Sequence, residues 1–135
     1  MASVFTKIIQ GELPSYKLME DKHSIAILAL DQVTLGHTLV IPKIEVDHWF
    51  DVPTEAFLQV QRNSQILARA LQKATQCPRV MTATVGFEVP HCHLHLIPAW
   101  SMADLNFARG VRRTPEEMKS IQERIIGHLH EAVSK

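Results

Sequence analysis

Three histidines occupy alternate positions of one short segment: His91, His93 and His95. The apolar residues of this segment and the proline that follows it predict a β-strand over 91–97. On a strand, alternate side chains share a face, so the three imidazoles would form a row with about 7 Å between neighbours. The residues between and after them would point into the core: Cys92, Leu94 and Leu96. Such a row indicates a function, because buried imidazoles need hydrogen-bond partners and protonated ones repel each other.

Two kinds of chemistry suit this row, and the residues alone leave both open. Neutral imidazoles bind zinc or copper, although three same-face positions on one strand span too far to converge, so that at most two would share an ion. A neutral imidazole also attacks phosphorus, and neighbouring N–H groups stabilise the charge on phosphoryl oxygens. In this second interpretation the flanking histidines fix the tautomer of the central one.

The elements that would position these histidines follow from hydrophobic periodicity and from the glycines and prolines. A short helix over 4–10 ends before Gly11, and a long amphipathic helix covers 53–75. A capping box at Thr114 opens a final helix. Five strands are predicted, over 16–20, 24–30, 37–41, 79–85 and 91–97. Because these strands come in adjacent blocks, we expect an α+β fold in which the long helix packs on a five-stranded antiparallel sheet.

The composition excludes several classes of protein. The 135 residues suit one domain, and a hydrophobic content of 46% excludes a disordered chain. Lys plus Arg and Asp plus Glu each number 14, and this zero net charge argues against a nucleic acid polymer as partner. The longest apolar run, 25–30, is too short to cross a membrane, and no signal peptide is visible. With two cysteines and no disulfide framework, we expect a cytoplasmic protein.

The segment His91–Ile97 matches, at each position, the His-φ-His-φ-His-φ-φ signature of the histidine triad (HIT) nucleotide-binding family, where φ is an apolar residue. Residues 5–15 resemble the amino-terminal block of that family and residues 36–43 resemble its central strand, in the right order. The resemblance covers about the first hundred residues. It implies a HIT-like fold, and we expect a single HIT domain over 1–135, with its core at about 3–100 and a carboxyl-terminal extension with a helix at about 101–135.

The resemblance implies catalytic roles for four histidines. His93 would attack the α-phosphate of a nucleotide conjugate to form a nucleotidyl-histidine, from which water releases the mononucleotide. His91 and His95 would contact phosphate oxygens or orient His93, and His37 would support them from the neighbouring strand. The implied activity is hydrolysis or transfer at a phosphoramidate or phosphoanhydride bond, without a cofactor.

A nucleotide pocket between the first helix and the second strand is also implied by the resemblance. Its apolar residues would be Phe5, Ile8, Ile27 and Leu30. Many relatives place an acidic residue on that strand to bond the ribose hydroxyls, and here Ala29 stands at that position. Asp31, two residues later, would share the face of Ala29 if the strand continued, and it is the candidate substitute.

Two further departures from the family pattern concern phosphate and metal. Phe87 and Glu88 replace a polar pair that binds phosphate, which leaves backbone N–H groups around Val89 as candidate phosphate donors. Ser3 and Thr6 replace a zinc-binding pair of cysteines, so we expect no metal.

Family members are commonly homodimers, so we expect a homodimer that binds a small nucleotide or nucleotide conjugate, with the long helix and a sheet edge at the interface. His48 and Trp49 are interpreted as a dimer contact or a loop anchor. Ala29 and Phe87 keep an alternative open, namely a non-catalytic purine nucleotide-binding module. A histidine-coordinated metalloprotein is a third hypothesis.

Overall fold

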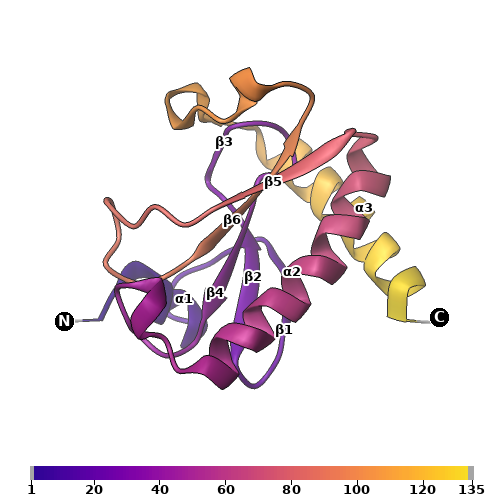
Figure 1. Ribbon diagram of the computed structural model, residues 1–135. Coiled ribbons are helices and arrows are strands. Elements are labelled where there is room, and N and C mark those ends of the chain that lie inside the picture. The colour runs from indigo at the N-terminus through magenta and orange to yellow at the C-terminus, as the bar shows by residue number, and fades with distance from the viewer. Residues whose placement is uncertain (1, 134–135) are drawn as a thin grey trace.

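A five-stranded antiparallel sheet lies at the centre of the protein (Figure 1). The computed structural model describes residues 2–133. The strands of this sheet are β1 (Lys17–Glu20), β2 (Ser24–Leu28), β4 (Thr38–Pro42), β5 (Arg79–Ala83) and β6 (Leu94–Ala99). Their order is β1-β2-β4-β6-β5, so β1 and β5 form the edges. The predicted α+β class and the antiparallel sheet are confirmed.

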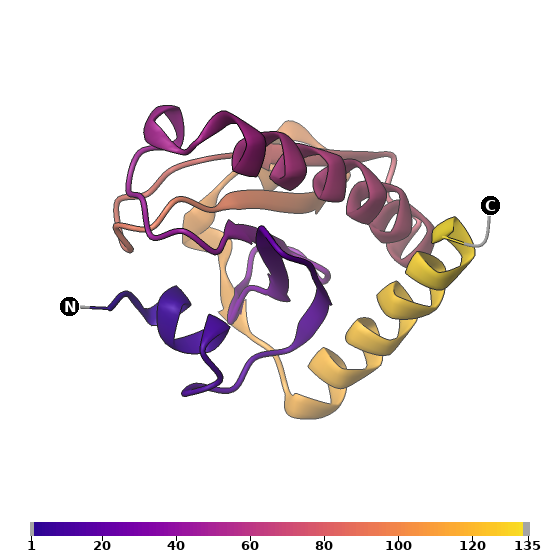
Figure 2. The same cartoon turned by 90° about the horizontal axis from the view of Figure 1, so that it is seen from below.

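Helices cover both faces of the sheet, as the two views show (Figures 1 and 2). The helices are α1 (Val4–Ile9), α2 (Thr54–Thr75) and α3 (Pro115–Val133). α2 and α3 contribute to the hydrophobic cluster on one face, and α1 contributes to the cluster on the other. Because both faces are covered, every residue of β2, β4 and β6 is buried.

Strand alternation assigns each core side chain to one of these two faces. On β2, Leu28 packs in the cluster of α2 and α3, whereas Ile27 packs with Phe5 of α1. The larger cluster is centred on the long helix, where Leu67 and Leu71 are fully buried. The apolar stripe of α2 therefore packs on one face of the sheet, and the histidines lie on the opposite face.

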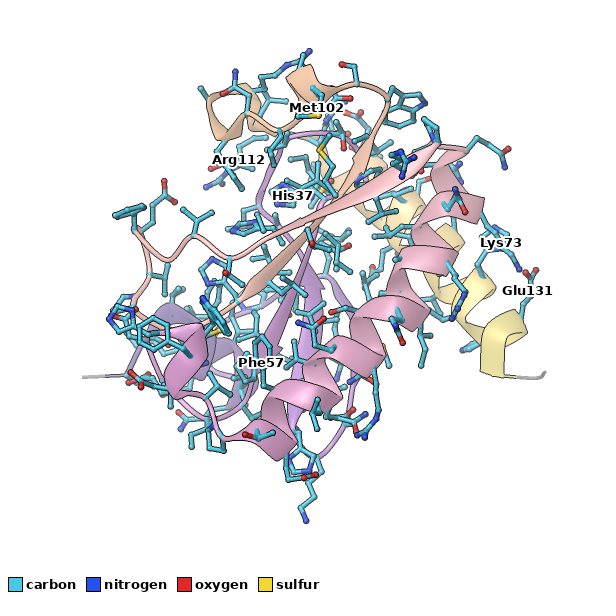
Figure 3. All side chains as sticks on the ribbon, in the orientation of Figure 1. His37, Phe57, Lys73, Met102, Arg112 and Glu131 are labelled. Atoms are coloured by element: carbon cyan, nitrogen blue, oxygen red, sulfur yellow. The ribbon has the colours of Figure 1, made fainter. Side chains whose placement is uncertain are left out.

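The final helix packs on α2 and on the edge strand β1. The residues predicted to form its apolar face are all buried: Met118, Ile121, Ile125 and Leu129. An ion pair at the surface joins α2 to α3, with Lys73 Nζ 3.9 Å from a Glu131 oxygen (Figure 3). Within the described part of the chain, none of the helices combines the length and the hydropathy that crossing a bilayer requires.

A second, two-stranded sheet was not predicted. β3 (Asp31–Gln32) pairs antiparallel with β7 (Val111–Arg112), and the Asp31 carboxylate accepts a hydrogen bond from Arg112 Nε at 2.8 Å. This pairing fixes the long connection after β6, which carries two short 3₁₀ helices, Met102–Asp104 and Phe107–Arg109 (top of Figure 1). A third 3₁₀ turn, Trp49–Asp51, precedes α2.

The prediction of a strand over 91–97 was wrong at its start, because β6 begins at Leu94. β4 pairs with β6 through Val40 and Leu94. Continuing that register would place Cys92 opposite Pro42, which has no N–H to donate. The Cys92 N–H instead donates to the carbonyl of Val46 at 2.7 Å. His91 and His93 therefore lie in the turn that leads into the strand.

Candidate active site

The three imidazoles stay on one side of the sheet although two of them precede the strand. The ring of Phe5, from α1, makes edge contacts with His91 and His93 at centroid distances of 5.8 and 4.8 Å. The rings of His93 and His95 are 4.8 Å apart. The structure therefore brings the predicted row together next to the amino-terminal helix.

The central imidazole presents an unprotonated nitrogen. His93 Nδ1 lies 2.8 Å from the backbone oxygen of His91, and because a carbonyl only accepts hydrogen bonds, Nδ1 carries the proton. Burial is the main reason that the pKa of His93 is lowered, so the ring is neutral near pH 7 and Nε2 holds a lone pair. Among the described residues, Arg113 Nε is the only side-chain polar atom that is both sealed from solvent and unpaired. His93 Nε2 also has no hydrogen-bond partner among the described residues, but it is not among the sealed atoms. It is therefore open to solvent.

His37 and His95 form a relay that sets the tautomer of His95. The backbone N–H of Val33 lies 3.2 Å from His37 Nδ1 and can only donate, so the proton of His37 sits on Nε2. His37 Nε2 then donates to His95 Nδ1 at 2.9 Å, which places the remaining proton of His95 on its own Nε2. The backbone of Asp31 acts on His37 in the opposite direction to burial, because it favours the protonated form. His95 thus offers an N–H donor beside His93.

Burial keeps both members of this relay neutral. Burial lowers the pKa of His37 to about 4 and that of His95 to about 3. Phe107, from the connection after β6, contributes to that burial, since its ring meets the ring of His95 at 4.7 Å. A neutral His95 keeps the tautomer that the relay imposes, because only a neutral imidazole has one N–H donor and one acceptor nitrogen.

The turn before β4 holds His37 in place. The amide of Gln32 donates to the carbonyls of Ala29 and His37 at 2.6 and 2.9 Å, and its oxygen accepts from the N–H of Gly36 at 2.8 Å. Gly36 has a φ of 104°, and a Cβ there would lie 3.2 Å from both Pro98 and Thr75. Only glycine suits this position, and the connection between β2 and β4 is a tightly bonded turn.

His91 is sealed from ligands. It is 0% exposed, and both ring nitrogens have partners: Nε2 donates to the carbonyl of Pro42 at 2.8 Å and Nδ1 accepts from Ser3 Oγ at 2.7 Å. Of the two roles expected for His91, phosphate contact and orientation of His93, the geometry favours orientation, because its carbonyl holds His93 Nδ1. Sequence reasoning gave no signal for the contact with Ser3, which is 88 positions away.

The residues predicted to bind the nucleoside separate into two groups. Phe5 and Ile27 pack in one buried cluster, with Ile8 and Val89 against its edge, and Ala29 belongs to the same cluster. Leu30 is 57% exposed, and neither it nor Asp31 belongs to this cluster. Asp31 is turned to Arg112 because β2 ends at Leu28 and the chain enters β3 instead of continuing the same face.

A cavity of about 670 Å³ opens beside His93, and we call it the aromatic cavity. Its lining residues are Asp47, His48, Trp49, Phe50, Thr84, Val85, Gly86, Phe87, Pro90, Cys92 and His93. Sequence reasoning did not place Phe50 in any site and treated Phe87 only as a departure from the family pattern. The available signal was that Trp49, Phe50 and Phe87 are large aromatic residues outside the predicted helices and strands. In such segments hydrophobic periodicity does not indicate which way a side chain points.

The antiparallel sheet with an imidazole row at the start of an inner strand defines the histidine triad class of proteins. The family model of the HIT domain matches residues 10–102. The chain belongs to the HIT domain family.

Relatives and solved structures agree with this assignment. A Bacillus subtilis protein named "Protein hit" is 36% identical over 106 residues, which cover 75% of this chain and 73% of that protein. The Saccharomyces cerevisiae "Adenosine 5'-monophosphoramidase HNT1" is 37% identical over 98 residues, which cover 72% of this chain and 62% of that protein. A crystal structure of a zinc-bound histidine triad family protein from Mycobacterium smegmatis has a TM-score of 0.84 at 28% identity, covering 99% of this chain and 97% of that one.

The residues near the amino terminus do not fit a zinc ion. Ser3 and Thr6 supply hydroxyl groups, and the Glu45 carboxylate accepts from the Ser3 N–H at 2.7 Å and from Thr6 Oγ1 at 2.6 Å. The nitrogen of His91 that could bind a metal accepts the Ser3 hydroxyl instead. Across residues 2–133, no group of three or more His, Cys, Asp or Glu side chains is arranged to hold a metal. This donor set makes a hydrogen-bond network around His91, because zinc prefers thiolate and imidazole ligands.

Proposed function

We propose that this protein is a hydrolase or transferase that acts at the α-phosphate of a nucleoside monophosphate conjugate, through a nucleotidyl intermediate on His93. The observation that carries the proposal is the pairing of tautomers. His93 presents a lone pair on an open Nε2, and His95 beside it presents an N–H. A nucleophile and a donor for the phosphoryl oxygens are the two groups that displacement at phosphorus requires.

The reaction proceeds in two displacements. In the first, His93 Nε2 bonds to phosphorus while the bond to the leaving group breaks, and the electron pair of that bond departs with the leaving nitrogen or oxygen. The imidazole becomes cationic, and its Nδ1–H donates more strongly to the carbonyl of His91, which already lies at 2.8 Å. In the second, water attacks phosphorus and gives up a proton to solvent while the P–Nε2 bond breaks. The electron pair of that bond returns to Nε2, which restores neutral His93 and releases the mononucleotide. His95 Nε2–H stabilises the oxygen charge in both steps.

The nucleoside would bind beside α1. Ile8 and Val89 are half-buried at the edge of the cluster that holds Phe5 and Ile27, and they offer apolar contacts for the base. This cluster reaches His93 through the Phe5 ring, at a centroid distance of 4.8 Å. Backbone N–H groups near Val89 are proposed phosphate contacts. Leu30 and Asp31 are left out of the proposed site because they lie outside the apolar cluster. The similarity to the yeast monophosphoramidase supports an adenosine phosphoramidate as the first conjugate to test, with phosphoanhydrides as the other class.

We further propose that the protein acts as a homodimer. β5 is an edge strand of the sheet, and an edge strand has backbone groups free to pair with a second chain. Light scattering coupled to size-exclusion chromatography tests this. A mass of twice 15.3 kDa is expected, and a mass of 15.3 kDa at micromolar concentration would contradict it.

One observation favours a second candidate, a non-catalytic nucleotide-binding module. Ala29 is 6% exposed in an apolar cluster, so no carboxylate is available there for the ribose hydroxyls. Phe87 and Glu88 replace polar phosphate contacts. Measurable affinity for a nucleoside monophosphate without turnover of any conjugate would favour this candidate.

The proposed function is tested by turnover and by intact-protein mass spectrometry with adenosine 5'-phosphoramidate. We expect release of the monophosphate and a nucleotidyl adduct in protein quenched during turnover. His93→Ala should abolish both. His23→Ala removes an imidazole from the turn between β1 and β2 and serves as the matched control, with both signals retained. Turnover by His93→Ala at the rate of the unmutated protein would refute the mechanism.

A further inference from the structure

The aromatic cavity lies directly beside the nucleophile. Cys92 and His93 form part of its wall, and the other walls come from the loop before α2 and from the loop before His91. Its volume of about 670 Å³ falls within the roughly 300–1,000 Å³ of small-molecule sites. A substrate bound with phosphorus at His93 Nε2 therefore has room for a sizeable group in this cavity.

Three aromatic side chains in the cavity wall remain exposed: Trp49 (51%), Phe50 (66%) and Phe87 (94%). Two of them are held by neighbours, since Trp49 packs on Phe57 at 5.7 Å and Phe50 stacks on His48 at 5.0 Å. Exposing large rings to water is unfavourable, and rings held in place at a cavity are suited to contacts with an apolar or aromatic ligand.

The charge of the cavity disfavours one class of leaving group. No Lys or Arg is present among the described residues that line the cavity, and Asp47 contributes a carboxylate. The charge of Glu88 also reaches His93, where it acts to raise the pKa against the lowering by burial. A phosphate or polyphosphate leaving group carries negative charge and needs cationic partners. An amine leaving group instead becomes an ammonium ion, which a carboxylate and aromatic faces attract.

We propose that the aromatic cavity is the leaving-group subsite, and that Trp49, Phe50 and Phe87 select phosphoramidates of apolar or aromatic amines over conjugates that lose a phosphate. This inference rests on the proposed function. In the step concerned, the P–Nε2 bond to His93 forms as the P–N bond of the substrate breaks. The electron pair goes to the amine nitrogen, which takes up two protons from water in the open cavity, the first to form the neutral amine and the second to form the ammonium ion that leaves beside Asp47. Attack of water on the nucleotidyl-histidine and ionisation of the released monophosphate later return two protons to solvent.

The selectivity is measured with three adenosine conjugates: the tryptamine phosphoramidate, the ethylamine phosphoramidate and diadenosine tetraphosphate. We expect kcat/KM for the tryptamine conjugate to exceed that for the ethylamine conjugate roughly tenfold, as contacts with two or more rings would give. The tetraphosphate should be the poorest substrate. Equal kcat/KM for the two amines, or preference for the tetraphosphate, would overturn the inference while leaving the proposed function standing.

Single variants assign the preference to the cavity. Phe87→Ala and Trp49→Ala should each reduce the tryptamine-to-ethylamine ratio by about threefold or more. Trp100→Ala is the matched control, because Trp100 is equally exposed (52%) but follows the far end of β6, and the ratio should not change. If the tryptamine-to-ethylamine ratio is unchanged in both cavity variants and their oligomeric state changes instead, this face is an interface between subunits. That result would overturn the subsite.

A binding measurement separates failure of the subsite from failure of the proposed function. The His93→Ala protein cannot form the nucleotidyl bond, so calorimetric titration reports affinity for the intact conjugates. We expect tighter binding of the tryptamine conjugate than of the ethylamine conjugate, and loss of the difference when Phe87→Ala is added. If no conjugate is turned over by the unmutated protein but this difference is present, the hydrolase proposal fails, the inference of a leaving-group subsite falls with it, and the cavity is only a binding site for the amine group. If the difference is absent, the subsite fails.

Discussion

Acidification should destabilise the protein in a pH range set by its buried histidines. His37 and His95 are 2% and 9% exposed, and burial lowers their pKa values to about 4 and about 3. In the unfolded chain both would titrate near 6.5. Between these values the unfolded state binds more protons than the folded state. Stability is therefore complete above about pH 6.5 and is lost as the pH falls toward the folded-state pKa values.

The size of the effect follows from the shift at His37. A pKa of about 4 in the folded state against about 6.5 in the unfolded state gives a loss of about 2 kcal/mol in unfolding free energy between pH 7 and pH 5. His95 acts in the same direction. This loss is a large part of the roughly 5–15 kcal/mol that stabilises a typical domain. Most of this loss in unfolding free energy occurs at pH values above those at which Asp and Glu side chains of the unfolded chain take up protons, so it can be separated from their titration.

Urea unfolding at pH 7 and pH 5 measures this loss. In His37→Gln the amide can still donate to His95 Nδ1 and its oxygen can accept the Val33 N–H, but the buried titratable group is gone. The difference between the two pH values should shrink by about 2 kcal/mol. His23→Gln, in the turn between β1 and β2, is the control and should retain the full difference. An unchanged difference in His37→Gln would show that burial of neutral His37 does not cause the loss of stability.

Three further outcomes test other parts of the structure. Ser3→Ala removes the hydroxyl that donates to His91 Nδ1. It should lower kcat roughly tenfold and leave KM within about twofold, because the His91 carbonyl that holds His93 is then less well fixed. A roughly tenfold rise in KM would indicate a binding role instead. Leu67→Ala, at a fully buried position of α2, should cost about 2–5 kcal/mol of unfolding free energy, and a cost below about 1 kcal/mol in urea unfolding would contradict the packing described. Burial raises the pKa of Cys92 to about 11, so iodoacetamide at pH 7.5 should leave Cys92 unmodified in the folded protein, as peptide mapping would show.

Much of the fold could be predicted from local sequence because each main element carries its own periodic signal. The apolar face of the final helix is one example, since the structure buries Ile121 and Ile125. The continuous apolar run over 25–30 is another, since it lies in and just beyond the fully buried strand β2. Two-residue strands have no such periodicity, so the pairing of Asp31 with Arg112 could not be predicted.

The candidate site was predictable in its histidines but not in the contacts that set their protonation. The spacing of the row located His93 and His95. The tautomers depend on partners that the chain brings from elsewhere, such as the Val33 N–H on His37 and the Ser3 hydroxyl on His91. The late start of β6 at Leu94, after His91 and His93, has a similar origin, because Pro42 lies on the neighbouring strand β4. Local patterns do not report on such distant partners.

In the proposed mechanism, His93 carries the nucleotide during turnover. Rapid quenching of a single turnover with adenosine 5'-phosphoramidate, followed by peptide mapping, tests it most directly. We expect an adduct on His93 that forms and decays at rates that reproduce steady-state turnover. Turnover without an adduct, or an adduct that forms on a different residue, would contradict it.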